Sequence, residues 1–196
     1  MEFQPANRAY GLTPNIGFRT FIKVKQQDQT IFYEPFQNNT ANNAFKTRQK
    51  MLIQPSELVL EETNETLGLK IMVRYFTLPQ EPIAALVRIV EVINISNNEL
   101  DLEIIDGQPK IIPYWMSNDV LKYMSHTAQA WAKVTNFEKT GIPFYQLKVE
   151  IIDKPEVQAL KEGNFYFALE NINGALQPAQ MIIDPELIFG EVTDYN

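Results

Sequence analysis

The sequence predicts a mainly β protein, made of stacked antiparallel sheets with one amphipathic helix packed on a sheet. Many short segments alternate apolar and polar residues with the period of two that is typical of strands. Pro, Gly and Asn separate these segments, which favours antiparallel strands joined by turns. A single stretch of the chain has the longer period of a helix.

Residues 67–77 predict a strand. Its alternate positions form one fully apolar face, made of Leu67, Leu69, Ile71, Val73 and Tyr75. Six further segments have strand character, namely residues 18–24, 31–33, 51–54, 58–62, 145–152 and 164–170.

Residues 86–104 predict a β-hairpin. Residues 86–95 are apolar on both faces, which indicates a central strand covered on two sides. The Ser-Asn-Asn sequence at residues 96–98 has turn chemistry, because Asn tolerates a positive φ and its side chain can bond nearby backbone. The return strand, residues 99–104, then alternates acidic and apolar residues.

Residues 117–133 are expected to form one amphipathic helix that lies across the outer face of a sheet. Apolar residues recur at spacings of four, four and three, at Val120, Met124, Ala128 and Trp131. Ser117 or Asn118 can cap the helix, and Asp119 in the first turn complements the helix dipole. The opposite face carries Lys122, His126, Gln129 and Lys133. Trp131 is therefore expected to belong to the core.

We expect one domain over residues 1–196, because no linker or internal repeat divides the chain. The polar stretch at residues 37–43 predicts an exposed loop. Residues 181–183 and 187–189 have strand character, and the chain stops about seven residues later. Since sheet-like sequence lies so close to this end, we expect the chain to be the N-terminal part of a longer enzyme.

Composition and charge exclude several classes of protein. The 24 Asp and Glu residues outnumber the 17 Lys and Arg residues, and the resulting net charge of −7 repels nucleic acid. The absence of Cys and the single His exclude thiol nucleophiles and the usual zinc sites. No signal peptide and no apolar run near the ~20 residues of a membrane span is present. We therefore expect a cytoplasmic protein without metal, cofactor, nucleic-acid or membrane partner.

The sequence offers no strong catalytic group. Phosphate-binding glycine loops and the G-x-S-x-G nucleophile motif do not occur. Asp101 and Glu103 lie roughly 6.6–6.8 Å apart on one strand face, as the carboxylates of some glycosidases do. Any strand with acids at alternate positions gives this distance, so we interpret the pair as part of a solvated face. His126 is interpreted as a surface residue, and no catalytic residue is predicted.

Tyr114, Trp115 and Asp119 are the candidate residues near a carbohydrate. They lie around the junction between a strand and the predicted helix. Aromatic rings at such a junction either fill the core or stack on a sugar, and the sequence leaves both readings open.

Several short blocks, in matching order, resemble a known family. They are Asp106-Gly107-Gln108-Pro109, Pro113-Tyr114, Ala130-Trp131, residues 143–149 and residues 162–167. Over residues 67–189 the chain is similar to the N-terminal β-sandwich region of bacterial glycoside phosphorylases of the cellobiose phosphorylase group. The likeness is greatest to β-1,2-oligoglucan phosphorylases and to the related part of cyclic β-1,2-glucan synthases. Gln108 and Trp115 depart from the family pattern, which has an apolar residue and Gly there.

The resemblance implies a galactose mutarotase-like β-supersandwich that precedes an (α/α)6 barrel. In this family the barrel carries the catalytic acid and the phosphate site, so no catalytic residue transfers to this chain. The expected function is that of a non-catalytic domain that supports a helical catalytic domain, in the same or a separate chain, acting on β-glucan oligosaccharides. A second copy of the chain is a further expected partner.

Two alternatives remain open. An independent sugar-binding module needs exposed aromatic side chains, for which Trp115 and Trp131 are the candidates. A free-standing sugar epimerase or lyase on the same fold needs a His and a carboxylate in one cleft, and His126 is the sole histidine.

Overall fold

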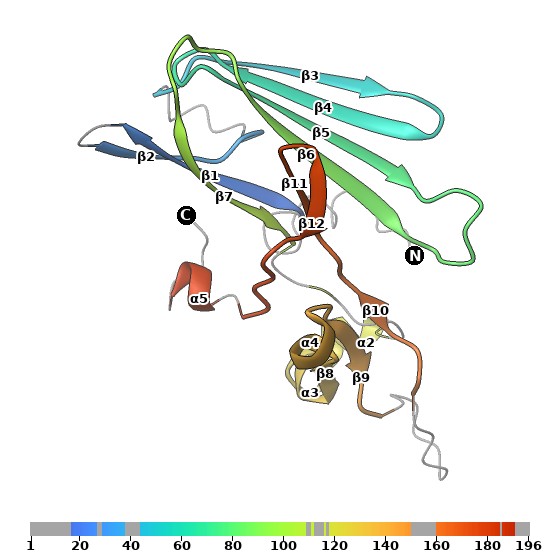
Figure 1. Cartoon of the computed structure of the whole chain (residues 1–196). Coiled ribbons are helices and arrows are strands. Elements are labelled where there is room, and N and C mark those ends of the chain that lie inside the picture. The colour runs from blue at the N-terminus through green and yellow to red at the C-terminus, as the bar shows by residue number, and fades with distance from the viewer. Residues whose placement is uncertain are drawn as a thin grey trace. The chain divides into compact units, whose positions relative to one another are not determined.

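The computed structural model describes residues 17–26, 29–37, 44–108, 111, 116, 118–149, 160–184 and 186–190. These residues are mainly β, with antiparallel sheets and a few short helices, as predicted (Figure 1). Most of the polar loop at residues 37–43, the cap candidate Ser117 and residues 150–152 of one predicted strand lie outside the described residues.

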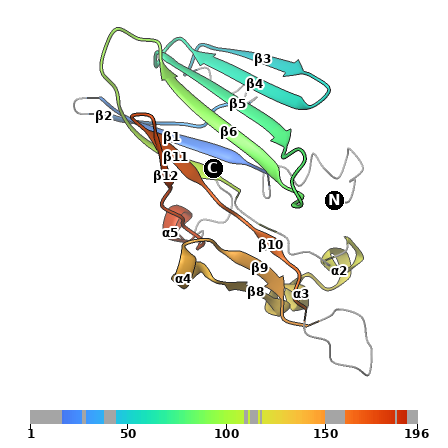
Figure 2. The ribbon, with the colours of Figure 1, turned by 45° about the vertical axis from the view of Figure 1, so that its right-hand side comes forward.

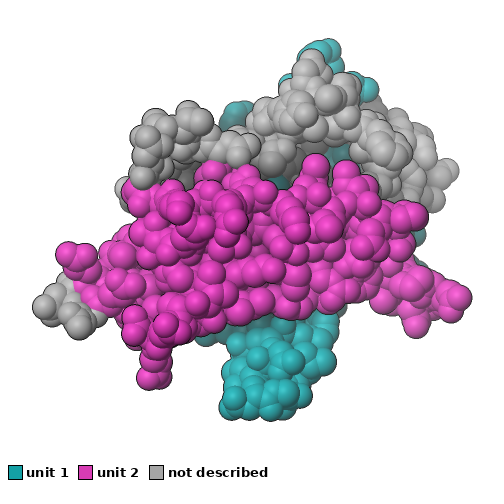
Figure 3. Space-filling view, turned by 90° about the horizontal axis from the view of Figure 1, so that it is seen from above, with its two compact units in different colours: residues 1–17, 108–196 teal, residues 18–107 magenta. Residues whose placement is uncertain are grey.

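The chain groups into two compact units, coloured separately in Figure 3. Unit 2 consists of residues 18–107, and unit 1 consists of residues 1–17 together with residues 108–196. One domain over residues 1–196 stays a prediction.

Unit 2 is a sandwich of two antiparallel sheets (Figure 1, Figure 2). The three-stranded sheet has the order β2-β1-β7 and is formed by β1 (Arg19–Gln26), β2 (Gln29–Tyr33) and β7 (Asp101–Gly107). The four-stranded sheet has the order β3-β4-β5-β6 and is formed by β3 (Thr47–Ile53), β4 (Glu57–Asn64), β5 (Leu69–Thr77) and β6 (Leu86–Asn94).

The core of unit 2 lies between these two sheets. The first sheet contributes Ile22, Val24 and Tyr33, and the second contributes residues of β5 and its preceding turn, namely Leu67, Leu69, Ile71 and Val73. Burial of each aliphatic side chain stabilises the fold by roughly 1.5–3 kcal/mol relative to exposure. The predicted apolar face of residues 67–77 is thereby confirmed for these four positions.

The predicted hairpin of residues 86–104 is wrong. β6 pairs with β5 in one sheet, whereas β7 pairs with β1 in the other. Residues 96–98 therefore carry the chain from one sheet to the opposite one, and β6 is the outermost strand of its sheet in the described part rather than a central one. An alternating strand has the same pattern whether it pairs with its neighbour or faces it, so periodicity could not separate these two folds.

Side chains do stabilise this crossing as turn chemistry predicts. Asn94 Nδ2 donates to the carbonyl oxygen of Asn98 at 2.7 Å, and Ser96 Oγ donates to Asn94 Oδ1 at 2.7 Å. The backbone N–H of Ile95 donates to the Gly68 carbonyl at 2.8 Å, which ties the crossing to the turn before β5.

Unit 1 has shorter elements. Its helices are α2 (Asn118–Tyr123), α3 (Ser125–Trp131), α4 (Phe137–Thr140) and α5 (Glu186–Phe189). β8 (Ala132–Thr135), β9 (Phe144–Leu147) and β10 (Asn164–Phe165) form a sheet of order β10-β9-β8, and β11 (Leu169–Ile172) pairs with β12 (Ala175–Pro178) as a separate hairpin.

The single helix predicted for residues 117–133 is wrong. Two short helices are separated at Met124, and Lys133 belongs to strand β8. The second helix opens with Ser125, His126 and Thr127, residues of modest helix propensity, which is consistent with a break before them. The predicted faces are confirmed in part, because Ala128 is buried and Lys122 and His126 are exposed. Met124, which was predicted on the apolar face, is exposed instead.

Other strand boundaries also differ from prediction. β9 ends at Leu147, and the segment predicted as one strand at residues 164–170 contains β10 and only the start of a separate strand, β11. Residues 187–189 are helical and residues 181–183 form no strand. Within the described part of the chain, every helix is too short or too polar to cross a membrane.

Candidate functional site

The predicted carbohydrate-proximal residues are only partly described. Tyr114 and Trp115 lie outside the described residues. Asp119 lies in the first turn of α2 in unit 1, where it is exposed, as the dipole argument expects. Trp131 ends α3 and is partly buried.

Asp101 and Glu103 lie on an exposed face of β7 beside two lysines of β1. Glu103 pairs with Lys23 at 2.8 Å and with Lys25 at 2.5 Å, and Lys25 lies 3.9 Å from Asp101. Hydrogen bonds from these lysines lower the pKa of Glu103 to about 2. A general acid needs a raised pKa, so Glu103 is unsuited to donate a proton at neutral pH. The interpretation of this pair as a solvated face is confirmed.

His126 and the acidic residues form no metal centre in the described part of the chain. His126 is exposed on α3. No three His, Asp or Glu side chains within the described ranges gather closely enough to hold an ion.

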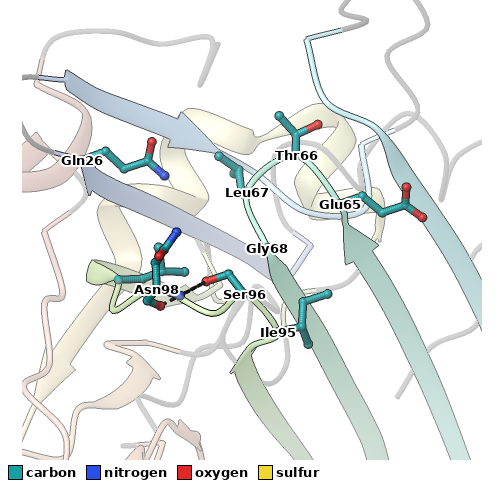
Figure 4. A pocket seen from close by; sticks show the side chains of 9 residues that line it. Gln26, Glu65, Thr66, Leu67, Gly68, Ile95, Ser96 and Asn98 are labelled. Atoms are coloured by element: carbon teal, nitrogen blue, oxygen red, sulfur yellow. Dashed lines mark hydrogen bonds between the residues drawn. The ribbon is translucent and has the colours of Figure 1, made fainter.

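The pocket in Figure 4 lies at one end of unit 2 and has a partly polar lining. It has a volume of about 350 Å³ and is formed where the turn between β4 and β5 meets the crossing from β6 to β7. Hydroxyl and amide side chains alternate with aliphatic ones around it: Gln26, Thr66, Ser96 and Asn98 with Leu67, Ile95 and Leu100. Such a lining suits a hydroxyl-rich ligand by hydrogen bonding, not by charge.

The carboxylate of the pocket, Glu65, is already engaged. It pairs with Lys46 at 2.5 Å and with Arg48 at 3.1 Å, and the hydrogen bond from Lys46 is the main cause that lowers its pKa. Thr66 Oγ1 accepts a hydrogen bond from the Lys46 backbone N–H at 2.9 Å. The pocket therefore presents neither a raised-pKa acid nor an activated nucleophile.

Unit 1 contains a second pocket, which is mainly apolar. Its volume is about 360 Å³, and Phe137, Ile142, Phe167 and Met181 contribute to its walls. The residues that line it carry no charge, so it can accommodate an apolar group but supplies no acid, base or metal ligand.

A buried polar cluster in unit 2 was not anticipated from the sequence. Glu62 is 1% exposed, and its Oε1 accepts a hydrogen bond from the Tyr33 hydroxyl. Its Oε2 accepts from the Phe36 backbone N–H at 2.8 Å and from Gln49 Nε2 at 2.6 Å. Burial, followed by the hydrogen bond and charge of Glu62, raises the pKa of Tyr33. The sequence held an indication of this burial, because Glu62 continues the series of inward-facing alternate residues that begins at Leu58.

A second cluster joins the two sheets of unit 2. Arg88 of β6 donates from Nε to the Tyr75 hydroxyl at 2.9 Å and from Nη2 to Thr20 Oγ1 at 3.0 Å, and it pairs with Asp106 of β7. Burial lowers the pKa of Arg88, but Asp106 and Tyr75 outweigh this and raise it overall. The polar side chains of both clusters are bonded to partners within their own cluster, so we assign them to structure and not to catalysis.

Comparison with known proteins adds no relative: no protein-family model matches the chain, and no curated protein matches it either.

Proposed function

We propose that this chain is a non-catalytic β-sandwich domain of a glycoside phosphorylase acting on β-glucan oligosaccharides. In this role it supports a separate (α/α)6 catalytic domain and forms one side of the glycan cleft. The galactose mutarotase-like supersandwich, the cytoplasmic location, the oligosaccharide and a second copy as partners belong to the same proposal, which rests on the sequence resemblance.

The observation that favours this supporting role is that several apolar side chains on regular strands are exposed. In β3, Met51, Leu52 and Ile53 are all exposed, and in β12 Leu176 is 69% exposed. Single exposed apolar residues are common on proteins, but runs of them on one strand usually mark a surface that another protein covers. A domain that docks on a catalytic partner needs such surfaces.

The chemistry of the described residues supports a role without catalysis. Glu65 and Glu103 have lowered pKa values and form ion pairs with lysine or arginine. Glu62 is fully enclosed. None of these groups combines access, a suitable pKa and a second catalytic residue, which glycoside cleavage needs.

The proposal is tested by assay of the chain alone and with a helical partner. The purified chain is incubated with β-1,2-linked gluco-oligosaccharides and inorganic phosphate, and glucose 1-phosphate is measured. No product is expected from the chain alone. Co-expression with the (α/α)6 domain of such a phosphorylase is expected to give a one-to-one complex on size exclusion.

The outcomes separate the competing functions. Release of glucose 1-phosphate by the chain alone would contradict the non-catalytic role. Calorimetric binding of oligosaccharide by the chain, without complex formation, would instead favour the independent sugar-binding module. Epimerisation or elimination of a sugar substrate would favour the free-standing enzyme.

A further inference from the structure

We propose that strand β3 is a docking edge that accepts an extended segment of a partner protein as an additional strand. The segment is one in which carboxylate side chains alternate with aliphatic side chains. This inference rests on the geometry of unit 2, and it shares with the proposed function the exposed apolar side chains of β3.

The first observation is that β3 presents backbone groups along an open edge. Among the described residues β3 is the outermost strand of its sheet, beside β4 (Figure 1). Gln54 and Glu57 exchange backbone hydrogen bonds at 2.8 and 3.4 Å, and Glu65 N–H donates to the Lys46 carbonyl at 2.9 Å. Since hydrogen-bonded pairs alternate in an antiparallel ladder, even-numbered residues of β3 face β4. The N–H and C=O groups of Thr47, Gln49, Met51 and Ile53 therefore point away from the sheet.

The second observation is a row of cations on one face of this edge. Lys46, Arg48 and Lys50 are two residues apart, so their side chains project on the same face at intervals of roughly 6.6–6.8 Å. Glu65 forms ion pairs with Lys46 and Arg48, whereas Lys50 has no ion pair among the described residues. A strand laid against β3 would meet this row with every second side chain.

The third observation concerns the opposite face of the same strand. Met51 and Ile53 are 62% and 75% exposed, and they lie in register with Leu60 and Leu58 of β4. An incoming strand that placed aliphatic side chains beside Met51 and Ile53 would bury apolar area on this face while its other face met the cations. One segment satisfies both faces when acidic and aliphatic residues alternate.

Charge repulsion argues against a second copy of β3 as the strand that pairs with this edge. Antiparallel pairing of all seven residues of β3 with themselves places Lys50 opposite Lys50 of the second copy, and like charges directly opposite destabilise a strand pair. The net charge of −7 adds repulsion between copies.

The fold itself shows which strand chemistry suits alternate lysines. Lys23 and Lys25 of β1 lie in register with Glu103 and Asp101 of β7, and these side chains form ion pairs. The acidic residues of β7 alternate with Leu102 and Ile104. Arg48 and Lys50 repeat the spacing of Lys23 and Lys25 on a strand whose outer side is open in the described structure.

The test uses the full chain at a concentration where light scattering shows a monomer. The probe is a fluorescent eight-residue peptide that alternates Asp or Glu with Leu or Ile, and its counterpart has Lys in place of the acids. Binding is followed by anisotropy, and amide exchange at Gln49, Met51 and Ile53 is followed by NMR. The variant Lys50→Glu is compared with Lys122→Glu, which changes the net charge equally on the exposed face of α2.

We expect the acidic peptide to bind at least about tenfold more tightly than the basic one and to slow exchange at the three edge amides. Lys50→Glu should weaken this binding by about tenfold and Lys122→Glu by less than about twofold. The inference is overturned if both peptides bind alike, or if the two variants bind alike. It is also overturned if the free monomer already protects these amides, which would mean that a segment of the chain itself occupies the edge. Protection that rises with protein concentration alone would assign the edge to a second copy.

Discussion

Unit 2 and the described part of unit 1 differ in how their elements are stabilised. In unit 2, strands of up to nine residues bury a continuous apolar face between two sheets. In unit 1, β9 and β8 have four residues each, and the buried side chains include Ala128, Gln146 and Leu147. Gln146 Nε2 donates to the carbonyls of Lys161 and Leu160, at 3.1 and 3.3 Å. The described part of unit 1 is thus stabilised by particular polar contacts. Unit 2 is stabilised mainly by burial of the apolar residues that recur at alternate strand positions.

The largest expected difference between the units comes from removing apolar volume. Ile71→Ala in β5 should lower the free energy of unfolding of unit 2 by roughly 2–5 kcal/mol, because the fully buried side chain leaves a cavity. Leu176→Ala in β12 should change stability by less than about 0.5 kcal/mol, because that side chain is already exposed.

Urea unfolding followed by two probes measures this effect unit by unit. Trp131 lies in unit 1, so its fluorescence, measured in a Trp115→Phe background, reports that unit. Amide exchange in β5 reports unit 2. Equal destabilisation by the two variants would contradict the comparison.

Replacing the buried carboxylate of unit 2 should have the next largest effect. Glu62→Leu would leave the Tyr33 hydroxyl, Gln49 and the Phe36 N–H without their shared acceptor, at a cost of about 3 kcal/mol. Glu62→Gln, the matched control, keeps one acceptor oxygen and should cost less. If the two variants were equally stable in urea unfolding, the cluster would not contribute through its hydrogen bonds.

The same cluster predicts the alkaline limit of stability. The pKa of Tyr33 is raised above its ordinary value of 10.0, so the folded state keeps this phenol protonated longer than the unfolded state does. Its contribution is fully present below about pH 10 and is lost as pH rises above it. Near pH 11 the phenolate absorbance of native Tyr33→Phe should therefore equal that of the unsubstituted native chain, because Tyr33 is still protonated at this pH. If the substitution lowers the native absorbance by that of a full tyrosine, the raised pKa of Tyr33 is wrong.

The sequence predicted unit 2 better than unit 1 for a physical reason. The face from Leu67 to Val73 is correct because burial on one side of a strand imposes a period of two. The same pattern could not assign residues 86–94 and 101–107 to different sheets, because both arrangements bury alternate side chains. In unit 1 the elements are too short for a period to develop, and residues 187–189 form a helix where three apolar residues suggested a strand.

The candidate site was predicted less well than the fold. Asp119 was placed correctly in a first turn, and the solvated character of Asp101 and Glu103 was recognised from their spacing. The pocket of Figure 4 was not predicted, because Gln26 at the end of β1 and Thr66 and Ser96 in two separate connections are brought together only in the folded chain. The sequence alone does not indicate that residues so far apart along the chain line one pocket.

A glycine in each unit provides a smaller test. Gly68 has φ +67, and a Cβ there would lie 2.6 Å from Ser96 Cβ, whereas Gly174 has φ +86 with no atom within 4 Å of such a Cβ. Gly68→Ala should destabilise unit 2 by roughly 1–3 kcal/mol through strain and overlap. Gly174→Ala should cost about 1 kcal/mol through backbone strain alone. Equal shifts in the urea midpoint would show that the overlap between a Cβ at position 68 and Ser96 is relieved without loss of stability.

The smallest expected effect is the acid titration of the exposed face of β7. The pKa of Glu103 is lowered to about 2 by Lys23 and Lys25, so its stabilising contribution is present above the ordinary value of 4.5 and is lost as pH falls toward 2. Because these side chains are exposed, salt should weaken the effect. NMR titration of the Glu103 carboxyl carbon should give a midpoint near 2 at low salt, and Lys25→Met should raise it while Lys139→Met, on α4 of unit 1, leaves it unchanged. A midpoint near 4.5 in the unsubstituted chain would mean that the ion pairs of β1 and β7 do not persist in solution, and the preference of lysine-bearing strands for acidic neighbours would then lose its internal example.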